Sequence, residues 1–219
     1  MYKRMVVVVE NEDFLRSLIA GFLENAGFNV STAATGSDAK RLIDSVDPDA
    51  VVLDIDLGYG PTGIDIADWL VEKTDEVAIV FLTALADPRF ANSNVQKLHP
   101  RAAYLNKNLL KDAELLVEAL ETVLTEKDVS RVRHDQLPNR PLGDLSRTQI
   151  QILQLLAEGK TNQQIADIRQ RSLAATESAI TRTLRALGID GEIEMNSRVL
   201  ATRIYIESIG LITPHENRI

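Results

Sequence analysis

The stretch Val51-Val52-Leu53-Asp54 joins a short apolar run to an acid, and Ile55-Asp56-Leu57-Gly58 follows it. An apolar run of this length, bounded by polar and glycine residues, is typical of a strand that is buried on both faces of a sheet. Asp54 therefore stands where that strand would end. Three other apolar runs of the chain end in the same manner, and together they predict both the fold and a site.

Each of these three runs is followed by a polar side chain: 6–9 by Glu10 and Asn11, 77–82 by Thr83, and 102–105, after one residue, by Lys107. In an open parallel sheet the carboxyl ends of the strands share one edge, and ligands bind beyond that edge where the strand order reverses. We therefore expect these polar side chains to meet Asp54 in one crevice.

The segments between the runs show the spacing of helices. Apolar residues recur every three or four positions near 14–23, 39–43, 64–71 and 116–124, and a more polar helix is predicted near 88–98. A short strand near 28–30 brings the number of predicted strands to five. Five strands that alternate with five helices predict an α/β domain over residues 1–124, with a doubly wound five-stranded parallel sheet.

The rest of the chain has a different pattern. Residues 125–144 are polar, contain Pro138 and Pro141 and show no sustained period, which predicts a linker. Residues 145–219 are predicted to form an all-α domain, because their apolar pattern is purely helical. Four helices are expected, near 146–158, 162–169, 174–187 and 197–209. Ser146 and Thr161 each stand three residues before a glutamine, which is the spacing of a capping box.

Composition excludes several classes of protein. The 219 residues contain no cysteine, so neither a disulfide framework nor a thiolate metal site is possible. No apolar run approaches the roughly 20 residues that span a bilayer, so we predict a cytoplasmic protein with no membrane partner. Residues 1–139 hold 14 Lys and Arg against 23 Asp and Glu, whereas residues 140–219 hold 10 against 9. This uneven charge indicates two units with different partners.

The expected crevice has the side chains that phosphoryl transfer requires, namely an oxygen nucleophile, a cation and hydrogen-bond donors. Asp54 is the candidate phosphoacceptor. Thr83 would donate a hydroxyl group, and Lys107 would supply a mobile positive charge. Oxygen ligands suit Mg²⁺, and Glu10 is a candidate metal ligand. The glycine-rich loop 58–63 beside them favours a flexible connection with positive φ angles over a phosphate cradle.

Residues 3–124 resemble the receiver domain of bacterial two-component response regulators. The resemblance rests on Val-Val-Glu10-Asn11-Glu-Asp-Phe-Leu-Arg16, Val-Val-Leu-Asp54-Ile-Asp56-Leu, Leu-Thr83-Ala84 and Tyr104-Leu-Asn-Lys107. It implies that Asp54 accepts a phosphoryl group from a histidine kinase. It also implies that Thr83 and Tyr104 couple phosphorylation to a change at the surface.

The chain departs from that family at two positions of the site. The metal ligands that the resemblance implies are Glu10, Asn11, Asp54 and Asp56. Asn11 stands where the family usually has a second acid, so we predict weaker Mg²⁺ binding than at a three-acid site. Asp56 would partly restore the charge, or else repel a phosphoryl group or hold the attacking water. Asn108 stands where the family usually has a proline after a cis bond, and a cis bond before another residue costs about 3–4 kcal/mol. Either the bond is trans and Lys107 is displaced, or the fold supports a strained cis bond; we expect the trans bond.

Residues 145–212 resemble the four-helix DNA-binding domain of the LuxR type, through Leu-Leu-Ala-Glu-Gly159-Lys-Thr-Asn162-Gln-Gln-Ile165-Ala166 and Leu184-Arg-Ala-Leu187-Gly188. The resemblance implies a helix-turn-helix whose recognition helix, near 174–187, enters the major groove of double-stranded DNA. It also implies a homodimer that pairs through the fourth helix. The residues expected to face DNA are Arg169, Arg171, Glu177, Ser178, Thr181, Arg182 and Arg185.

Two other functions stay open at this stage. The helical half would bind a protein in a phospho-signalling adaptor, and both Glu177 and the nearly neutral charge of this half favour that function. Alternatively, Asn11 and Asn108 would hold the receiver in one state, and the protein would bind DNA independently of phosphorylation. No second catalytic constellation is present in the sequence, so we do not expect an enzyme with a small-molecule substrate.

Overall fold

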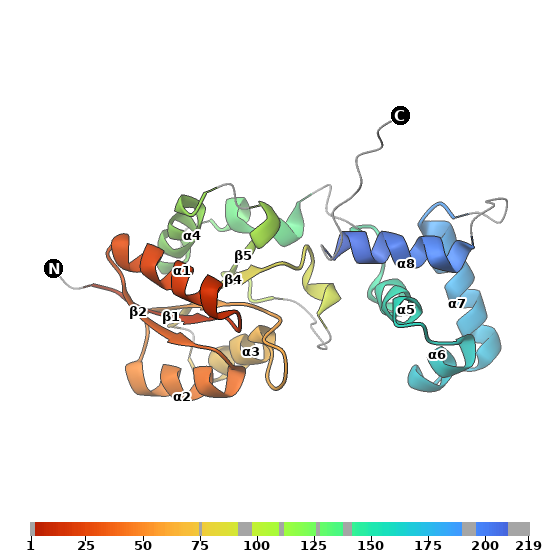
Figure 1. Cartoon of the computed structure of the whole chain (residues 1–219), viewed down its shortest axis with the longest axis horizontal. Coiled ribbons are helices and arrows are strands. Elements are labelled where there is room, and N and C mark those ends of the chain that lie inside the picture. Colours follow the sequence, from red (N-terminus) through yellow and green to blue (C-terminus); the bar gives the residue numbers. More distant parts are fainter. Residues whose placement is uncertain are drawn as a thin grey trace. The chain divides into compact units, whose positions relative to one another are not determined.

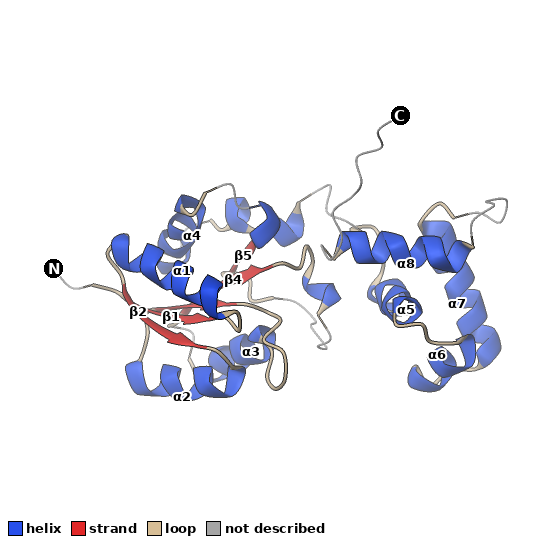
Figure 2. Cartoon of the chain, viewed as in Figure 1, coloured by secondary structure: helices blue, strands red, loops and turns tan. Residues whose placement is uncertain are grey.

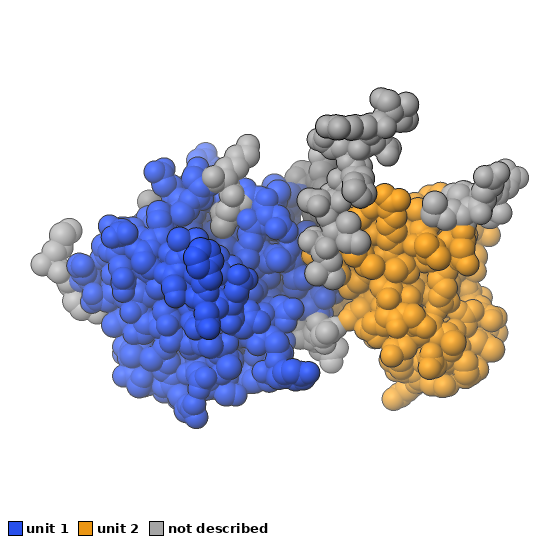
Figure 3. Space-filling model, in the orientation of Figure 1, with its two compact units in different colours: residues 1–137 blue, residues 138–219 orange. Residues whose placement is uncertain are grey.

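The computed structural model describes residues 3–74, 76–91, 98–109, 112–125, 128–137, 142–189 and 196–209. The chain divides into two compact units, residues 1–137 and 138–219 (Figure 3). The first unit contains the strands and the second is helical (Figure 2). The boundary falls within the segment that the sequence predicts as a linker, and two short 3-10 turns, Ser130–Val132 and His134–Gln136, belong to the first unit.

The first unit is built on a five-stranded parallel sheet, as the sequence predicts (Figure 1). The strands are β1 (Met5–Val9), β2 (Asn29–Ala33), β3 (Ala50–Leu53), β4 (Ala78–Thr83) and β5 (Ala103–Asn106). Their order in the sheet is β2-β1-β3-β4-β5, so the chain reverses direction across the sheet between β1 and β3. The expected site belongs at the carboxyl ends of these two strands.

Helices α1 (Asp13–Asn25), α2 (Gly36–Val46), α3 (Gly63–Lys73) and α4 (Glu114–Leu124) connect or follow the strands. The hydroxyl of Thr35 caps α2, and Thr62 with Asp65 forms a complete capping box at the start of α3. The helix predicted near 88–98 appears only as a 3-10 turn at Pro88–Phe90, and residues 92–97 of that prediction lie outside the described part of the chain.

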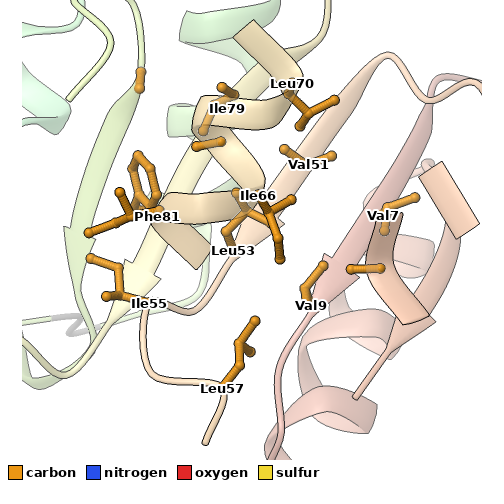
Figure 4. Packing of buried hydrophobic residues seen from close by; sticks show 14 of the residues in the cluster. Val7, Val9, Val51, Leu53, Ile55, Leu57, Ile66, Leu70, Ile79 and Phe81 are labelled. Atoms are coloured by element: carbon orange, nitrogen blue, oxygen red, sulfur yellow. The ribbon is translucent and has the colours of Figure 1, made fainter. Parts of the chain in front are cut away.

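Alternate residues of each strand point to opposite faces of the sheet, and both faces are covered. Val7, Val9, Val51 and Leu53 pack against α2 and α3, together with Ile66 of α3 (Figure 4). On the other face, the neighbouring strand residues pack against α1 and α4, a cluster that includes Val6, Val8, Val52, Val80, Ile19, Leu23 and Leu120. Burial on both faces explains why β1 and β3 are continuous apolar runs, whereas the border strand β2 is only partly buried and contains Asn29, Ser31 and Thr32.

The second unit contains α5 (Arg147–Ala157), α6 (Asn162–Ile168), α7 (Leu173–Ala186) and α8 (Ser197–Ser208), which confirms the four predicted helices. Both predicted capping boxes are present, at Ser146 with Gln149 and at Thr161 with Gln164. Helix α5 packs against α7 and α8, and α6 packs against α7. No helix in the described part of the chain is long and apolar enough to cross a membrane.

Candidate functional site

Three charged side chains from three strand ends meet in the first unit. Glu10 follows β1, Asp54 follows β3 and Lys107 follows β5. The Lys107 ammonium donates to Glu10 Oε2 at 2.5 Å and to Asp54 Oδ2 at 2.7 Å. The two acids are almost fully buried, with 2% and 7% of their surface exposed. The structure thus brings together the nucleophile, the acid and the cation that were predicted to share the crevice.

Backbone contacts fix the two carboxylates at the edge of the sheet. Glu10 N–H donates to the Ala33 carbonyl at 3.1 Å, and Asp54 N–H donates to the Val9 carbonyl at 2.9 Å. The Arg16 guanidinium, one turn into α1, donates to the Glu10 carbonyl at 2.8 Å. These bonds continue the backbone of β1 and β3 by one residue, and they fix Glu10 and Asp54 at the carboxyl ends of these strands.

The charge of Lys107 is maintained by its partners. Burial alone would lower the pKa of this ammonium, because a low-dielectric environment disfavours the charged form. The charges and hydrogen bonds of Asp54 and Glu10 outweigh burial, so the pKa of Lys107 lies above its ordinary value. The site therefore keeps a fixed positive charge beside the candidate phosphoacceptor at physiological pH.

Lys107 is not displaced, contrary to the expectation from the sequence. The described residues include no cis peptide bond, as expected. However, Lys107 still reaches both acids, because a tight 3-10 turn follows β5 and its polar side chains hold it. Asn106 Oδ1 accepts from Asn108 N–H at 2.8 Å. The side-chain amides of Asn106 and Asn108 both donate to the Ala84 carbonyl, at 3.3 and 3.4 Å.

Thr83 ends β4 and Tyr104 lies in β5, and both are fully buried. Thr83 Oγ1 accepts from Leu85 N–H at 3.4 Å, and the Tyr104 hydroxyl donates to the Leu85 carbonyl at 2.9 Å. Burial first, and then the negative charges of Asp135, Asp87 and Asp54, raise the pKa of Tyr104 well above its ordinary value. The loop after β4 therefore connects the threonine with the aromatic residue.

The expected metal ligands are only partly gathered. Asn11 and Asp56 are exposed, and Asp56 Oδ1 accepts from Gly58 N–H at 3.2 Å. Within the described residues, no group of three or more His, Cys, Asp or Glu side chains is placed to hold a metal ion. Glu10 and Asp54 do converge on one cation, the Lys107 ammonium. Carboxylate oxygens are ligands that suit Mg²⁺, so Glu10 and Asp54 are the residues that would hold this ion.

The glycines of loop 58–63 have two different roles. Gly58 and Gly60 adopt φ angles of 76° and 103°, which confirms the expected need for positive φ in this connection. Gly63 has another reason to be glycine, which the sequence did not reveal. A Cβ atom at this position would lie 2.1 Å from the carbonyl oxygen of Asp54. The absence of a side chain lets α3 begin directly against the candidate phosphoacceptor.

Helix α7 of the second unit presents one polar face. Its exposed residues include Glu177, Ser178, Thr181, Arg182 and Arg185, whereas Thr176, Ala179, Ile180 and Thr183 are buried. Thus all the expected DNA-facing residues of this helix share its exposed side. The hydroxyl of Thr181 donates to the carbonyl of Glu177 at 3.0 Å.

The turn between α6 and α7 carries the two other predicted arginines. Arg169 is half-buried and ends α6, whereas Arg171 is exposed. Gln170 between them adopts a φ of 51°, which makes the sharp turn. Arg198 of α8, which sequence reasoning missed, donates to Asn162 Oδ1 at 3.0 Å and also bonds the Lys160 carbonyl. No spacing signal marks Arg198, because its partners lie 36 and 38 positions away.

Comparison with known proteins agrees with both halves of this description. Residues 6–121 match the family described as the response regulator receiver domain. The chain belongs to the response regulators. Residues 144–195 of this response regulator match a second family, described as bacterial regulatory proteins of the luxR family. The protein therefore joins a receiver domain to a LuxR-type DNA-binding domain, as the sequence predicts.

Relatives share this organisation along most of their length. The response regulator is 25% identical to the transcriptional regulatory protein LiaR of Bacillus subtilis over an alignment of 199 positions, which covers 84% of this chain and 90% of LiaR. It is 28% identical to the nitrate/nitrite response regulator NarP of Escherichia coli, over 94% of this chain and 95% of NarP. A structure of RcsB from Salmonella enterica serovar Typhimurium covers 96% of the chain with a TM-score of 0.60 at 20% identity, which shows the shared fold.

Proposed function

We propose that Asp54 accepts a phosphoryl group from a histidine kinase, and that this event controls binding of a dimer of the protein to double-stranded DNA. The observation that carries this proposal is the pair of contacts from the Lys107 ammonium to Asp54 and Glu10. They place a permanent cation beside a buried carboxylate at the topological switch point of the sheet. A carboxylate there is positioned for reaction with a phosphorylated side chain of a partner.

In the transfer, a carboxylate oxygen of Asp54 attacks the phosphorus atom of the phosphohistidine. The P–O bond forms, the P–N bond breaks, and the imidazole leaves with the electron pair. Negative charge on the three transferred oxygens must be neutralised during this step. Lys107 supplies one fixed positive charge for those oxygens. Glu10 and Asp54 would hold Mg²⁺, which adds further positive charge to the phosphoryl group.

Thr83 and Tyr104 are proposed to report the presence of the phosphoryl group. The hydroxyl of Thr83 is a donor at the end of the strand next to β3, and its loop is bonded to the hydroxyl of Tyr104 through Leu85. If the Thr83 hydroxyl turns to a phosphoryl oxygen, its bond with Leu85 N–H is lost. The loop that Tyr104 holds then changes its position at the surface.

The polar face of α7 is proposed as the DNA-binding surface. Arg182 and Arg185 lie one turn or less apart on its exposed side, where they would contact phosphates or guanine edges. Ser178 and Thr181 would contact base edges or the backbone. Arg169 and Arg171 add positive charge at the turn before α7. RcsB, which shares the fold, has been determined as dimers on DNA, and pairing through α8 is proposed here.

Phosphorylation is tested on the full chain with a small-molecule phosphodonor and Mg²⁺, followed by intact mass measurement. We expect the mass of one phosphoryl group to be gained by wild type and lost in Asp54→Ala. Asp68→Ala is the matched control, because Asp68 is an exposed acid on α3, and it should be phosphorylated like wild type. Equal labelling of Asp54→Ala would overturn the assignment.

DNA binding is tested by selection from random duplexes with wild type, Asp54→Ala and protein loaded with beryllofluoride. A motif that is enriched only in the loaded wild type supports the proposal, and light scattering should then show a dimer. The same motif in all three samples would indicate DNA binding that is independent of phosphorylation. If no motif is enriched and no DNA affinity that falls with salt is measured, the protein is an adaptor whose helical unit contacts a protein instead.

A further inference from the structure

The outer edge of β5 is covered by the segment 128–137, which we call the strap. Strand β5 is the last strand of the sheet, so its outer backbone groups face no neighbouring strand. A single parallel bridge pairs Tyr104 with Arg133, and the N–H of Asn106 donates to His134 Nδ1 at 3.1 Å. These contacts fall on the residue before Lys107 and on the aromatic residue of the site.

Buried side chains anchor the strap to the first unit. Val132 is only 1% exposed and belongs to the same apolar cluster as Leu105 and Leu120. Arg133 and Asp135 form a buried ion pair with two parallel hydrogen bonds of 2.8 Å each. Both residues belong to the strap, so this pair holds the shape of the segment itself and adds little net stability. The burial of Val132 therefore anchors the strap to the receiver.

The strap is also the direct connection to the DNA-binding unit, which begins at residue 138. While the strap is docked, its residues do not lengthen the connection between the receiver and the DNA-binding unit. An extended residue spans at most about 3.6 Å, so release of the eight residues 130–137 would lengthen the connection by up to about 29 Å. Docking and release would thus change how far the DNA-binding unit can move from the receiver.

We propose that the strap couples phosphorylation of Asp54 to the freedom of the DNA-binding unit. The strap is docked on β5 when Asp54 is unmodified and is released when Asp54 is phosphorylated; this inference rests on the proposed function. The reason is geometric. A phosphoryl group on Asp54 takes the place where Lys107 Nζ now contacts the carboxylate, so Lys107 must shift to contact the phosphoryl oxygens instead. Lys107 is covalently joined to Asn106, whose N–H is held by His134. Movement of Lys107 therefore works against the bond that docks the strap.

Hydrogen exchange of the full chain, with and without Mg²⁺ and beryllofluoride, tests the inference. Amides of residues 54–58 should exchange more slowly in the loaded protein, and those of residues 130–136 should exchange faster. If the site slows while the strap is unchanged or slower, the coupling role is refuted and the phosphoacceptor assignment stands. If neither region changes, both proposals fall.

Linkage provides a second and independent measurement, because two coupled events must affect each other by the same factor. His134→Ala removes the hydrogen bond from Asn106 N–H, which the proposal expects to break when beryllofluoride binds. It should therefore tighten binding of beryllofluoride by about fivefold, the equivalent of one ordinary hydrogen bond. His99→Ala is the matched control, since His99 lies near the opposite ends of the strands, beside Val77 and Ala78, and it should leave the affinity unchanged. Unchanged or weaker binding in His134→Ala would contradict release.

Discussion

Replacement of Gly63 by alanine tests the close approach of α3 to the phosphoacceptor. The added Cβ atom would lie 2.1 Å from the Asp54 carbonyl oxygen and 2.8 Å from its carbonyl carbon, whereas ordinary contact begins at 3.4 Å. The obstacle is backbone on both sides, so rotation of a side chain cannot relieve it. The start of α3 and the end of β3 must therefore separate by about 1.3 Å, the difference between the first and last of those distances.

Two effects of different size follow from this movement. Overpacking of a tight interior costs about 1–3 kcal/mol, so the receiver unit should unfold at a lower urea concentration. The carboxylate of Asp54 also leaves its place beside Lys107, and a displacement of about 1 Å can slow a positioned reaction by about 100-fold. We expect phosphorylation of Gly63→Ala by a small-molecule donor, measured by intact mass, to be slower by about 100-fold.

Gly21→Ala is the matched control within the same unit. Gly21 lies inside α1, and an added Cβ would meet no atom within 4 Å. Alanine there should stabilise the unit by about 0.5–1 kcal/mol through helix propensity, with no effect on the rate. The reasoning is refuted if Gly63→Ala is as stable as wild type and is phosphorylated at the same rate.

Three further predictions concern the charged groups. Lys107→Ala should tighten Mg²⁺ binding in calorimetry, because Glu10 loses its competing cation, while phosphorylation slows by at least about 100-fold; weaker Mg²⁺ binding would contradict the shared site. Burial lowers the pKa of His134 below 6.5, against the opposing charge of Asp135, so the folded state binds fewer protons than the unfolded state. The receiver should lose stability in urea as pH falls below about 6.5, and His134→Gln should remove part of that loss; an identical pH profile would count against it. Glu177→Gln should relax a preference for cytosine at one position of the selected DNA motif by about 1–3 kcal/mol; a uniform gain for all sequences would show that no base is contacted.

The sheet and the meeting of Glu10, Asp54 and Lys107 were predictable because strand ends are encoded locally. A buried parallel strand reads as an apolar run, and its end is visible as the first polar residue. Parallel topology then brings those ends together without further information. The helix boundaries of the second unit were predictable for a similar reason, since capping residues such as Ser146 and Thr161 act within a single turn.

The consequence of Asn108 was not predictable from a pattern. A trans bond before Asn108 was expected to displace Lys107, but the side chain of lysine is long, and the amides of Asn106 and Asn108 hold the turn on the Ala84 carbonyl. Such amide contacts have no characteristic spacing. The dual reason for glycine in loop 58–63 was hidden as well, because a positive φ and a close approach both select glycine and only coordinates separate them.

The strap was missed because its docking depends on contacts between distant residues. One bridge, one imidazole bond and one buried valine produce neither the period of a helix nor that of a strand. The prolines and polar residues of 125–144 therefore indicated a linker. The hydrogen bond between Asn106 and His134, the bridge between Tyr104 and Arg133 and the burial of Val132 reveal that part of this segment belongs to the receiver.

Coverage of β5 also bears on how this protein avoids aggregation. The outer backbone groups of an uncovered border strand are a template for pairing with another chain, and proteins commonly protect them with a loop or a charge. Here the same residues that protect β5 are proposed to leave it on phosphorylation. Four residues form β5, which is short for a stable non-native pairing. The length of this strand thus limits the aggregation risk that the activated state would otherwise carry.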